Sequence, residues 1–340
     1  MSEEPITSSA NPKQQTLNEM PDDMLAEIMA KLDVKNRMES QSGCRRLSDV
    51  HRHVSKKYTK FSVHVEETRS CLIFDENKVT YNKSINGGCC IIDMFREPFI
   101  YKTFKENYVT KAMETVKLAL EGPRIEIRRL DVDINTVTGT EEMLRTLQKI
   151  CGELESRELE VKSASIRTTD VEATVSMLAL LEPGTLKKIE LQSCGPLTAT
   201  NISRLQTMPQ FKNSTEINMK TFALIDADLI FNYFRHFEVF SIAVHSMSTK
   251  QLFRLRSMLS ITEFVHFKSC LIRVSYPLRF AFDEIRKALG ELGLVDGDCQ
   301  DKIRYHRIIP YTGGAYLDFV IGNEEIEVTR HAQPQKNRKL

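Results

Sequence analysis

Apolar residues near the start of the chain recur at helical spacing. The segment Met20-Pro21-Asp22-Asp23 has the features of a helix start, because proline is tolerated in the first turn and acidic side chains favour the positive end of the helix dipole. The positions that follow predict one apolar face on a helix that ends near Leu32. These apolar positions are Met24, Leu25, Ile28, Met29 and Leu32.

Two further short helices are predicted before residue 58. We expect Asp33 to cap a second helix that begins near Val34. A third helix is expected over residues 44–54, with Leu47, Val50 and Val54 facing inward. Three short helices bury little apolar surface, so this unit is expected to be marginally stable alone and to lean on a partner.

From residue 61 the hydrophobic period changes to one that is typical of strands. Residues 71–74 and 78–81 flank Asp75-Glu76-Asn77 and predict a hairpin with a three-residue loop. The stretch from residue 85 to 104 fits neither period. A helix is predicted over residues 109–120, and Gly122-Pro123 follows it as a stop signal.

Six β-like runs of four residues then repeat along the chain. Their first and third positions are apolar and their second and fourth are mostly polar, which is the period of a half-buried strand. Between them, Thr138, Thr169 and Ser248 each precede a Glu or Gln by three residues and predict capped helix starts. The runs begin 23 to 30 residues apart, at Leu130, Leu159, Ile189, Ile217, Phe240 and Val265.

One strand and one helix per repeat predict an irregular, leucine-rich-repeat-like α/β solenoid, in which stacked units bury a continuous core. With the helical unit in front of it, the fold class is α+β or α/β. A helix over residues 280–289 and strands over 305–310, 316–321 and 326–329 are expected to end the solenoid.

The polar positions of the repeated runs offer a candidate binding surface. Neighbouring strands lie about 4.8 Å apart, so these side chains would stack into columns on one sheet face. Such a face either binds a target or is merely solvated, and the sequence leaves both interpretations open. The candidate target-binding residues are Asp133, Lys162, Gln192, Lys220 and Lys268.

The net charge and the composition of the first 15 residues exclude some classes of partner. The 340 residues include 47 basic and 46 acidic side chains, so nucleic acid is not an expected partner. The first 15 residues are polar and lack the apolar run of a secretory signal, and no stretch reaches the roughly 18–20 apolar residues of a membrane span. We expect no membrane partner and a location in the cytoplasm or nucleus.

The sequence contains no strong signature of catalysis. It has eight cysteines without a C-x-x-C pair, and its eight histidines lack metal-ligand spacing. Neither a Walker A motif nor G-x-G-x-x-G occurs. We therefore expect no catalytic residue, metal or cofactor. A thiol enzyme remains the weakest alternative, and Cys89-Cys90 is the cysteine pair expected nearest to solvent.

Residues 17–33 resemble an F-box. They carry its Leu-x-x-(Leu/Met)-Pro opening at Leu17, Met20 and Pro21, then an apolar helix that ends in Leu32-Asp33. Cys44-Arg45-Arg46-Leu47 stands where the nematode branch of that family carries Cys-(Arg/Lys)-x-(Leu/Phe).

The rest of the chain resembles the FTH domain, also called DUF38, of the nematode F-box A proteins. The similar segments are residues 78–81 with 86–89, 180–189, 236–240 and 264–267. The most specific of them is Pro183-Gly184-Thr185-Leu186 ahead of a strand.

The resemblance implies a domain plan: a polar tail at 1–15, an F-box at 16–58, and a connecting region of hairpin and helix at 59–123. An FTH solenoid at 124–330 and a basic tail at 331–340 complete it.

The resemblance also implies a function. F-box proteins bind the Skp1 adaptor of cullin-based SCF ubiquitin ligases, and their second domain recruits a protein substrate. Carried over residue by residue, the Skp1-facing positions would be Leu17, Met20, Pro21, Met24, Leu25, Ile28 and Leu32.

An alternative from another class is a scaffold whose F-box has decayed. Ser40 and Gly43 stand where the family usually carries Leu or Val. Glycine in a helix costs about 0.5–1 kcal/mol relative to alanine, and Ser40 removes an apolar contact.

Overall fold

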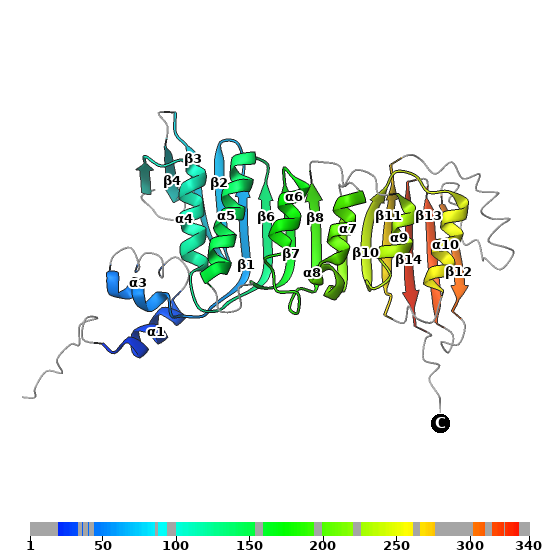
Figure 1. Ribbon diagram of the computed structural model, residues 1–340, viewed down its shortest axis with the longest axis horizontal. Coiled ribbons are helices and arrows are strands. Elements are labelled where there is room, and N and C mark those ends of the chain that lie inside the picture. The colour runs from blue at the N-terminus through cyan, green and yellow to red at the C-terminus, as the bar shows by residue number, and fades with distance from the viewer. Residues whose placement is uncertain are drawn as a thin grey trace, which may run out of the picture.

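The computed structural model describes residues 20–32, 36, 40, 44–85, 88–93, 100–153, 159–193, 199–219, 226–260, 266–275, 302–309, 315–322 and 324–332. Within these ranges the chain is a mixed α/β protein built on one long sheet, with two short helices attached near its N-terminal end (Figure 1).

The two N-terminal helices form a small unit with its own core. They are α1 (Asp22–Lys31) and α3 (Arg45–His51), and they pack against each other. Leu25, Met29, Val50 and Val54 are buried there, apart from the continuous core of the sheet. The third predicted helix is thus present as α3, with Val50 inward. The predicted second helix lies outside the described residues.

The sheet begins with an antiparallel part that includes the predicted hairpin. Residues 85–104, which fitted neither period, supply two of its strands. The predicted helix over 109–120 is confirmed as the element that follows. These elements are β1 (Lys56–Val65), β2 (Arg69–Phe74), β3 (Asn77–Lys83), β4 (Cys89–Asp93), β5 (Ile100–Phe104) and α4 (Tyr108–Leu120).

The hairpin turn is one residue shorter than predicted. Phe74 pairs with Asn77, so only Asp75 and Glu76 form the loop. Asp75 has a positive φ of 54°, which aspartate tolerates better than most residues. Its carboxylate accepts hydrogen bonds from the backbone N–H groups of Thr59 and Lys60 at 2.7 and 3.0 Å, which tie the turn to β1.

Strands and helices then alternate, as the repeated pattern predicted. The elements are β6 (Ile125–Ile134), α5 (Val137–Glu153), β7 (Glu160–Thr168), α6 (Val171–Leu178), β8 (Lys188–Ser193), α7 (Ala199–Thr207), α8 (Pro209–Asn213), β9 (Glu216–Met219), α9 (Ala227–Tyr233), β10 (Val239–Val244), α10 (Thr249–Leu259) and β11 (Ser269–Val274). The three C-terminal strands predicted are present as β12 (Lys302–Ile308), β13 (Tyr316–Gly322) and β14 (Glu325–His331). The helix predicted over 280–289 lies outside the described residues.

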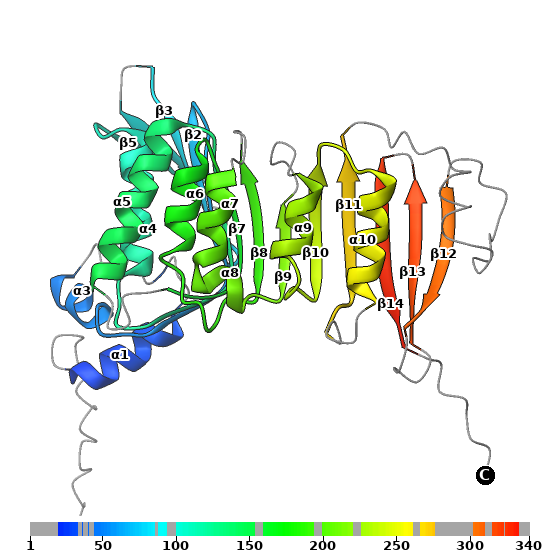
Figure 2. The ribbon, with the colours of Figure 1, turned by 45° about the vertical axis from the view of Figure 1, so that its right-hand side comes forward.

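The sheet runs in the order β12-β13-β14-β11-β10-β9-β8-β7-β6-β1-β2-β3-β4-β5. Strands β1 and β6 to β11 are parallel, and an antiparallel part lies at each end. The helices α4 to α10 cover one face of the sheet, and no helix among the described residues covers the other (Figures 1 and 2). Because this face is open, the parallel strands alternate apolar and polar side chains instead of reading as continuous apolar runs.

A row of bulges crosses the parallel strands. The N–H groups of Thr215 and Glu216 both donate to the carbonyl oxygen of Lys187, at 2.9 and 3.0 Å. In the next strand Glu238 and Val239 both donate to the carbonyl of Thr215, at 2.8 and 3.2 Å. Two donors against one acceptor mark a bulge, which shifts the burial alternation by one residue. Each long strand therefore has two apolar segments, one on each side of the bulge.

Because one strand can carry two apolar segments, two of the six predicted runs were aligned with the wrong segment of the neighbouring strand. The residues that align with Leu130 and Phe240 across the sheet are Ala164 and Cys270. The run that begins at Leu159 lies five residues too early, on the other side of the bulge. The run that begins at Val265 precedes Cys270 by the same five residues in the sequence, but Val265 itself lies outside the described residues. The sixth strand is β11, and residues 267–268 precede it. The runs from Leu130, Ile189 and Phe240 fall inside strands, and the run from Ile217 lies in β9 up to Met219, while its last residue, Lys220, lies outside the described residues.

A helix begins close to each of the three predicted caps, but the predicted capping residue is correct in only one of them. Ser248 and Gln251 form the reciprocal capping box at the start of α10. Helix α6 is capped by Asp170 instead of Thr169. At α5, the Thr136 hydroxyl accepts from the N–H of Gly139, so the cap lies two residues before Thr138.

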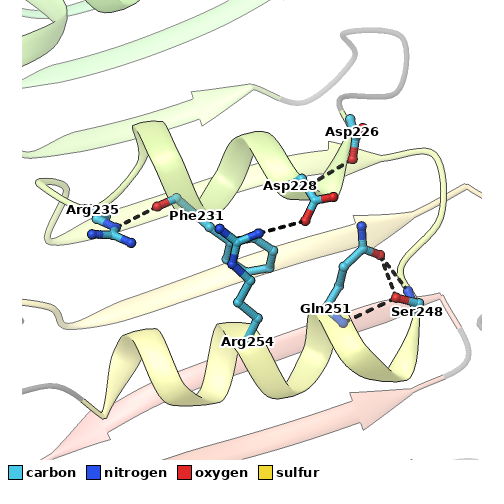
Figure 3. A network of polar contacts seen from close by, with 7 residues as sticks. All are labelled: Asp226, Asp228, Phe231, Arg235, Ser248, Gln251 and Arg254. Carbon is cyan, nitrogen blue, oxygen red and sulfur yellow. Dashed lines mark hydrogen bonds and ion pairs between the residues drawn. The ribbon is translucent and has the colours of Figure 1, made fainter.

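Ion pairs between neighbouring helices join the repeats on the helical side. Lys117 of α4 pairs with Glu153 of α5 at 3.7 Å, and Glu172 of α6 pairs with Arg204 of α7. Figure 3 shows the third pair, in which Arg254 of α10 reaches across to α9. Its Nη1 lies 3.1 Å from Oδ1 of Asp228, and its guanidinium carbon lies 4.6 Å from the centre of the Phe231 ring (Figure 3). Such contacts couple each repeat to the next.

Candidate functional site

The apolar face predicted on α1 divides into an inner and an outer half. Leu25 and Met29 are each only 1% exposed and form the core of the small unit. Met24 and Ile28 are 49% and 40% exposed and lie one turn apart, so they share one outward-facing stripe. Large apolar side chains that stay this exposed on a helix form a surface that a partner can cover.

This division corrects one of the predicted adaptor-facing residues. Leu25 points into the protein's own interior and has no surface to offer, because α3 packs against that side of α1. Pro21 is exposed, and Met20 and Leu32 are partly buried. Leu17 lies outside the described residues. The residues that could contact an adaptor in this conformation are therefore Met24 and Ile28, flanked by Met20, Pro21 and Leu32.

A buried lysine lies where the small unit meets the sheet. Lys56, at the start of β1, is almost fully buried, and its Nζ donates to the carbonyl oxygen of Leu118 at 3.1 Å and to that of Glu121. These carbonyls belong to the C-terminal end of α4, which is the negative end of the helix dipole and favours a cation. Arg52 pairs with Glu121 at 3.2 Å beside it. The small unit is thereby anchored to α4, the first helix of the sheet-and-helix body that the rest of the chain forms.

Gly122 is required at this junction. A Cβ atom placed on it would lie 2.8 Å from the carbonyl oxygen of Val54, the residue that leads into β1. Only glycine allows the two backbone segments to approach this closely.

The open face of the sheet contains a polar hollow with a volume of about 380 Å³. It lies where the antiparallel strands β2 and β3 meet the parallel strands β1, β6 and β7. Residues far apart in the sequence therefore meet in it. The lining residues are His64, Val65, Glu66, Arg69, Cys71, Ile73, Lys78, Thr80, Asp133, Asn135 and Arg167.

The charges in the hollow are only partly matched with one another. Arg69 donates twice to Glu66, at 2.8 and 2.9 Å, and this hydrogen bonding lowers the pKa of Glu66. Asp133 has looser neighbours: Nε of Arg167 lies 3.7 Å from its Oδ1, and Nδ1 of His64 lies 4.0 Å from its Oδ2. These longer distances leave the donors of Arg167 available to a ligand.

The predicted target-binding residues do not form one column. Asp133 lines the hollow, and Gln192 lies in its row two strands away, because Asp133 pairs with Arg167 and Arg167 with Gln192. Lys162 lies below the bulge in a second, smaller hollow of about 220 Å³, together with Glu126 and Arg128 among others. The five-residue register error had placed Lys162 beside Asp133.

The two other predicted positions also fall away from the hollow. Lys268 precedes β11 and pairs with Glu238 at 2.6 Å, a hydrogen bond that raises the pKa of the lysine. Lys220 lies outside the described residues.

Sequence reasoning missed most of the hollow. His64, Arg69, Lys78 and Arg167 were not candidates, although each is a polar residue at an outward position of a strand. For His64, the alternation of apolar and polar residues in β1 was a sequence signal that the side chain faces outward. The sequence held no signal for the parallel pairing of β1 with β6, which brings His64 opposite Asp133.

A second polar cluster lies at the C-terminal end of the open face. The carboxylate of Asp318 in β13 is covered by Arg304, which donates to Oδ2 at 2.7 Å, and by His306 and His331 at 3.1 and 3.9 Å. Tyr316 stacks on the His331 ring at 5.0 Å between centroids. Burial acts to raise the pKa of Asp318, but the hydrogen bonds and charge of Arg304, with the two histidines, outweigh it and hold the pKa below its ordinary value.

The described cysteines divide into buried and accessible thiols. Cys89, Cys90, Cys151 and Cys270 are buried, so the pair Cys89-Cys90 is not near solvent as expected. Burial raises the pKa of Cys89 and of Cys270, which disfavours the reactive thiolate. Cys44 and Cys71 are partly exposed, and Cys71 pairs across the sheet with His64 inside the hollow.

Two observations concern ligands and membranes. Among the described residues, no group of three or more His, Cys, Asp or Glu side chains is arranged to hold a metal ion. None of the helices in the described ranges is long and apolar enough to cross a membrane.

Comparison with known proteins adds two findings. The family model of the FTH domain matches residues 141–289, which run from α5 past β11. The chain is also similar to F-box A protein 224 of Caenorhabditis elegans, with 21% identity over 280 residues. That alignment covers 80% of this chain and 71% of the relative.

Proposed function

From its FTH domain and its similarity to an F-box A protein, we infer that this chain is a member of the nematode F-box and FTH family, and we propose that it is an adaptor. In this proposal the N-terminal unit binds a Skp1-type protein and, through it, a cullin. The sheet-and-helix body recruits a protein target for ubiquitin transfer, and the chain itself catalyses nothing.

One observation carries the proposal: Met24 and Ile28 stay exposed on a helix whose other large apolar residues, Leu25 and Met29, are buried. The buried pair Leu25 and Met29 gives α1 a fixed orientation, so the exposed pair is presented instead of collapsing inward. An apolar helical stripe of this kind fits an apolar groove on a partner. This supports a docking role for α1.

The body supports the second half of the proposal. Helices fill one side of the sheet and leave a broad polar face on the other, and the hollow around Asp133 lies in that face. A protein target could reach this face without contact with α1, which lies at one end of the molecule (Figure 2). The adaptor and the target would then bind independently.

Capture of a purified Skp1-type protein by the full-length chain tests the proposal. We expect wild type to bind, and Ile28→Asp and Met24→Asp each to weaken binding by about tenfold or more, because a charge would be buried in an apolar interface. Ala30→Asp is the matched control, since Ala30 is exposed on another side of α1. It should bind like wild type.

The scaffold with a decayed F-box is the competing function. It rests on Ser40 and Gly43, and the structure adds that the Ser40 hydroxyl donates to the carbonyl oxygen of Asn36 at 2.7 Å. That function predicts that wild type captures no Skp1-type protein under conditions in which another F-box protein does. Binding without cullin-dependent loss of any partner would favour it as well.

A further inference from the structure

The hollow on the open sheet face has an excess of basic donors. Its lining carries three side chains with a fixed positive charge, Arg69, Lys78 and Arg167, against the carboxylates of Glu66 and Asp133. Arg69 and Glu66 satisfy each other through two short hydrogen bonds. The remaining side chains therefore offer two cations to one carboxylate.

The geometry of those remaining groups leaves room for another anion. Arg167 approaches Asp133 only at 3.7 Å through Nε, which is longer than a good charge-assisted hydrogen bond of about 2.7–2.9 Å. No ion pair of Lys78 is found among the described residues, and its side chain is exposed at the rim. Arg167 on β7 and Lys78 on β3 line opposite sides of the hollow, so a carboxylate that enters it would face a cation on each side.

The volume and the lining of the hollow indicate that the carboxylate belongs to an amino-acid side chain. Its volume of about 380 Å³ is near the lower end of the roughly 300–1,000 Å³ of ligand sites, so it admits one or two side chains instead of a large cofactor. Cys71, Ile73 and Thr80 form a less polar part of the lining, against which the methylene groups of a glutamate could pack. The hollow opens on a face that no described helix covers.

We propose that this hollow binds a glutamate or aspartate side chain in an acidic segment of the recruited protein, with Arg167 as its direct contact and Lys78 as the second cation on the opposite side of the hollow. The proposal rests on the proposed function, since it assigns the class of target to the body of the adaptor. Asp133 lies beside the guanidinium of Arg167 and helps to orient it, and His64 lies on the other side of Asp133. Arg69 stays hydrogen-bonded to Glu66, and both side chains line the hollow without contacting the ligand carboxylate.

Three small probes with an acidic, a neutral and a basic side chain can test this. They are the N-acetyl N-methylamides of glutamate, glutamine and lysine, titrated into the full-length chain labelled with 15N at arginine. We expect the glutamate probe to shift the Nε–H resonance of Arg167 and to bind about tenfold more tightly than the glutamine probe, because only its carboxylate accepts charge-assisted hydrogen bonds from the guanidinium. The lysine probe should bind more weakly still.

Variants distinguish binding of the glutamate probe in the hollow from nonspecific attraction to surface charge. Arg167→Gln and Lys78→Gln should each weaken the glutamate probe by about fivefold or more, while Lys212→Gln, an exposed lysine of α8 on the helical side, should leave it unchanged. Urea unfolding midpoints would show that the variants remain folded. Equal binding of the glutamate and glutamine probes, or full binding by Arg167→Gln, would overturn the proposal.

The same variants distinguish this inference from the function on which it rests. Arg167→Gln and Lys78→Gln should still capture the Skp1-type protein, because the hollow lies at the C-terminal ends of β1, β6 and β7, whereas α1 and α3 lead into the N-terminal end of β1. Loss of the acidic probe with intact adaptor capture supports the assignment of the hollow. If wild type binds the acidic probe but no adaptor, the site stands and the adaptor function fails.

Discussion

The guanidinium of Arg46 in α3 closes on the first turn of α1, where its Nη2 lies 2.7 Å from Oδ1 of Asp22. The same nitrogen donates to the carbonyl oxygen of Met20 at 2.6 Å, so one side chain holds both the helix start and the chain that leads into it. Pro21, at the N-cap of α1, makes no side-chain capping bond. Arg46 thus fixes the orientation in which Met24 and Ile28 are presented.

Removal of this contact should loosen α1. We expect Arg46→Ala to weaken capture of a Skp1-type protein by about two- to fivefold, because a partly exposed ion pair contributes about 0.2–1 kcal/mol. Arg46→Lys should restore only part of it, since an ammonium lacks the planar fork. Titration calorimetry with purified adaptor measures the affinities. The neighbouring exposed Arg45→Ala serves as control, and a loss as large there would contradict this role.

The buried Lys56 should contribute to stability through the C-terminal end of α4. We expect Lys56→Met to lower the free energy of unfolding by about 1–3 kcal/mol, because two carbonyl acceptors lose a charged donor while the packing volume stays similar. Urea denaturation measures the change. The exposed neighbour Lys57→Met should cost less than about 1 kcal/mol. Equal costs at both positions would refute the capping role.

The pair of Arg254 and Asp228 between α10 and α9 should show measurable coupling. Both side chains are about half exposed, so we expect a double-mutant cycle of Arg254→Ala and Asp228→Asn to give about 0.2–1 kcal/mol. Arg254→Ala alone should cost more than Asp228→Asn, since it also removes the guanidinium from the Phe231 ring. Lys250→Ala, an exposed residue of the same helix, should be neutral. Strict additivity in the cycle would show that the helices are not coupled here.

Asp318 should make stability depend on pH at the acidic end. Its folded pKa is lowered, so its carboxylate stabilises the fold fully above the ordinary carboxyl pKa of about 3.9. That stabilisation is lost as the pH falls through the lower, folded value. We expect Asp318→Asn to be about 2 kcal/mol less stable than wild type at about pH 6, and the difference to shrink below about pH 4.

Urea unfolding at several pH values measures this difference. Asp133→Asn is the matched control, because its carboxylate has ion-pair partners at longer distances of 3.7 and 4.0 Å. It should show a smaller cost than Asp318→Asn at about pH 6. An Asp318→Asn difference that stays constant down to about pH 2 would contradict the lowered pKa.

Thiol accessibility should follow the burial pattern. In the native chain, Cys44 and Cys71 should react with a maleimide before any of Cys89, Cys90, Cys151 and Cys270, which should label only after unfolding. Mass spectrometry of digested samples gives the order. Cys71 should react at an ordinary rate near neutral pH. A rate many times that of Cys44 would instead favour thiol chemistry with the facing His64.

Local patterns predicted the elements well where one period dominated. The helix over residues 109–120 and the capping box of Ser248 with Gln251 were both found, because each depends on contacts within a few residues. The strand register was harder. Alternation recurs on both sides of the bulge row, so a slip of five residues preserved the pattern and placed Leu159 where Ala164 aligns with Leu130.

The sequence by itself determined that α1 has an apolar face and that strands and helices alternate through the body, because periodicity records which side of each element avoids water. Only the tertiary structure decided that Leu25 is buried while Ile28 is exposed. Only the pairing of β1 with β6 brought His64 and Asp133 together, and only that of β6 with β7 placed Arg167 beside them. Pairing between strands depends on contacts between residues far apart in the chain, and a local pattern does not encode which distant strand becomes the neighbour.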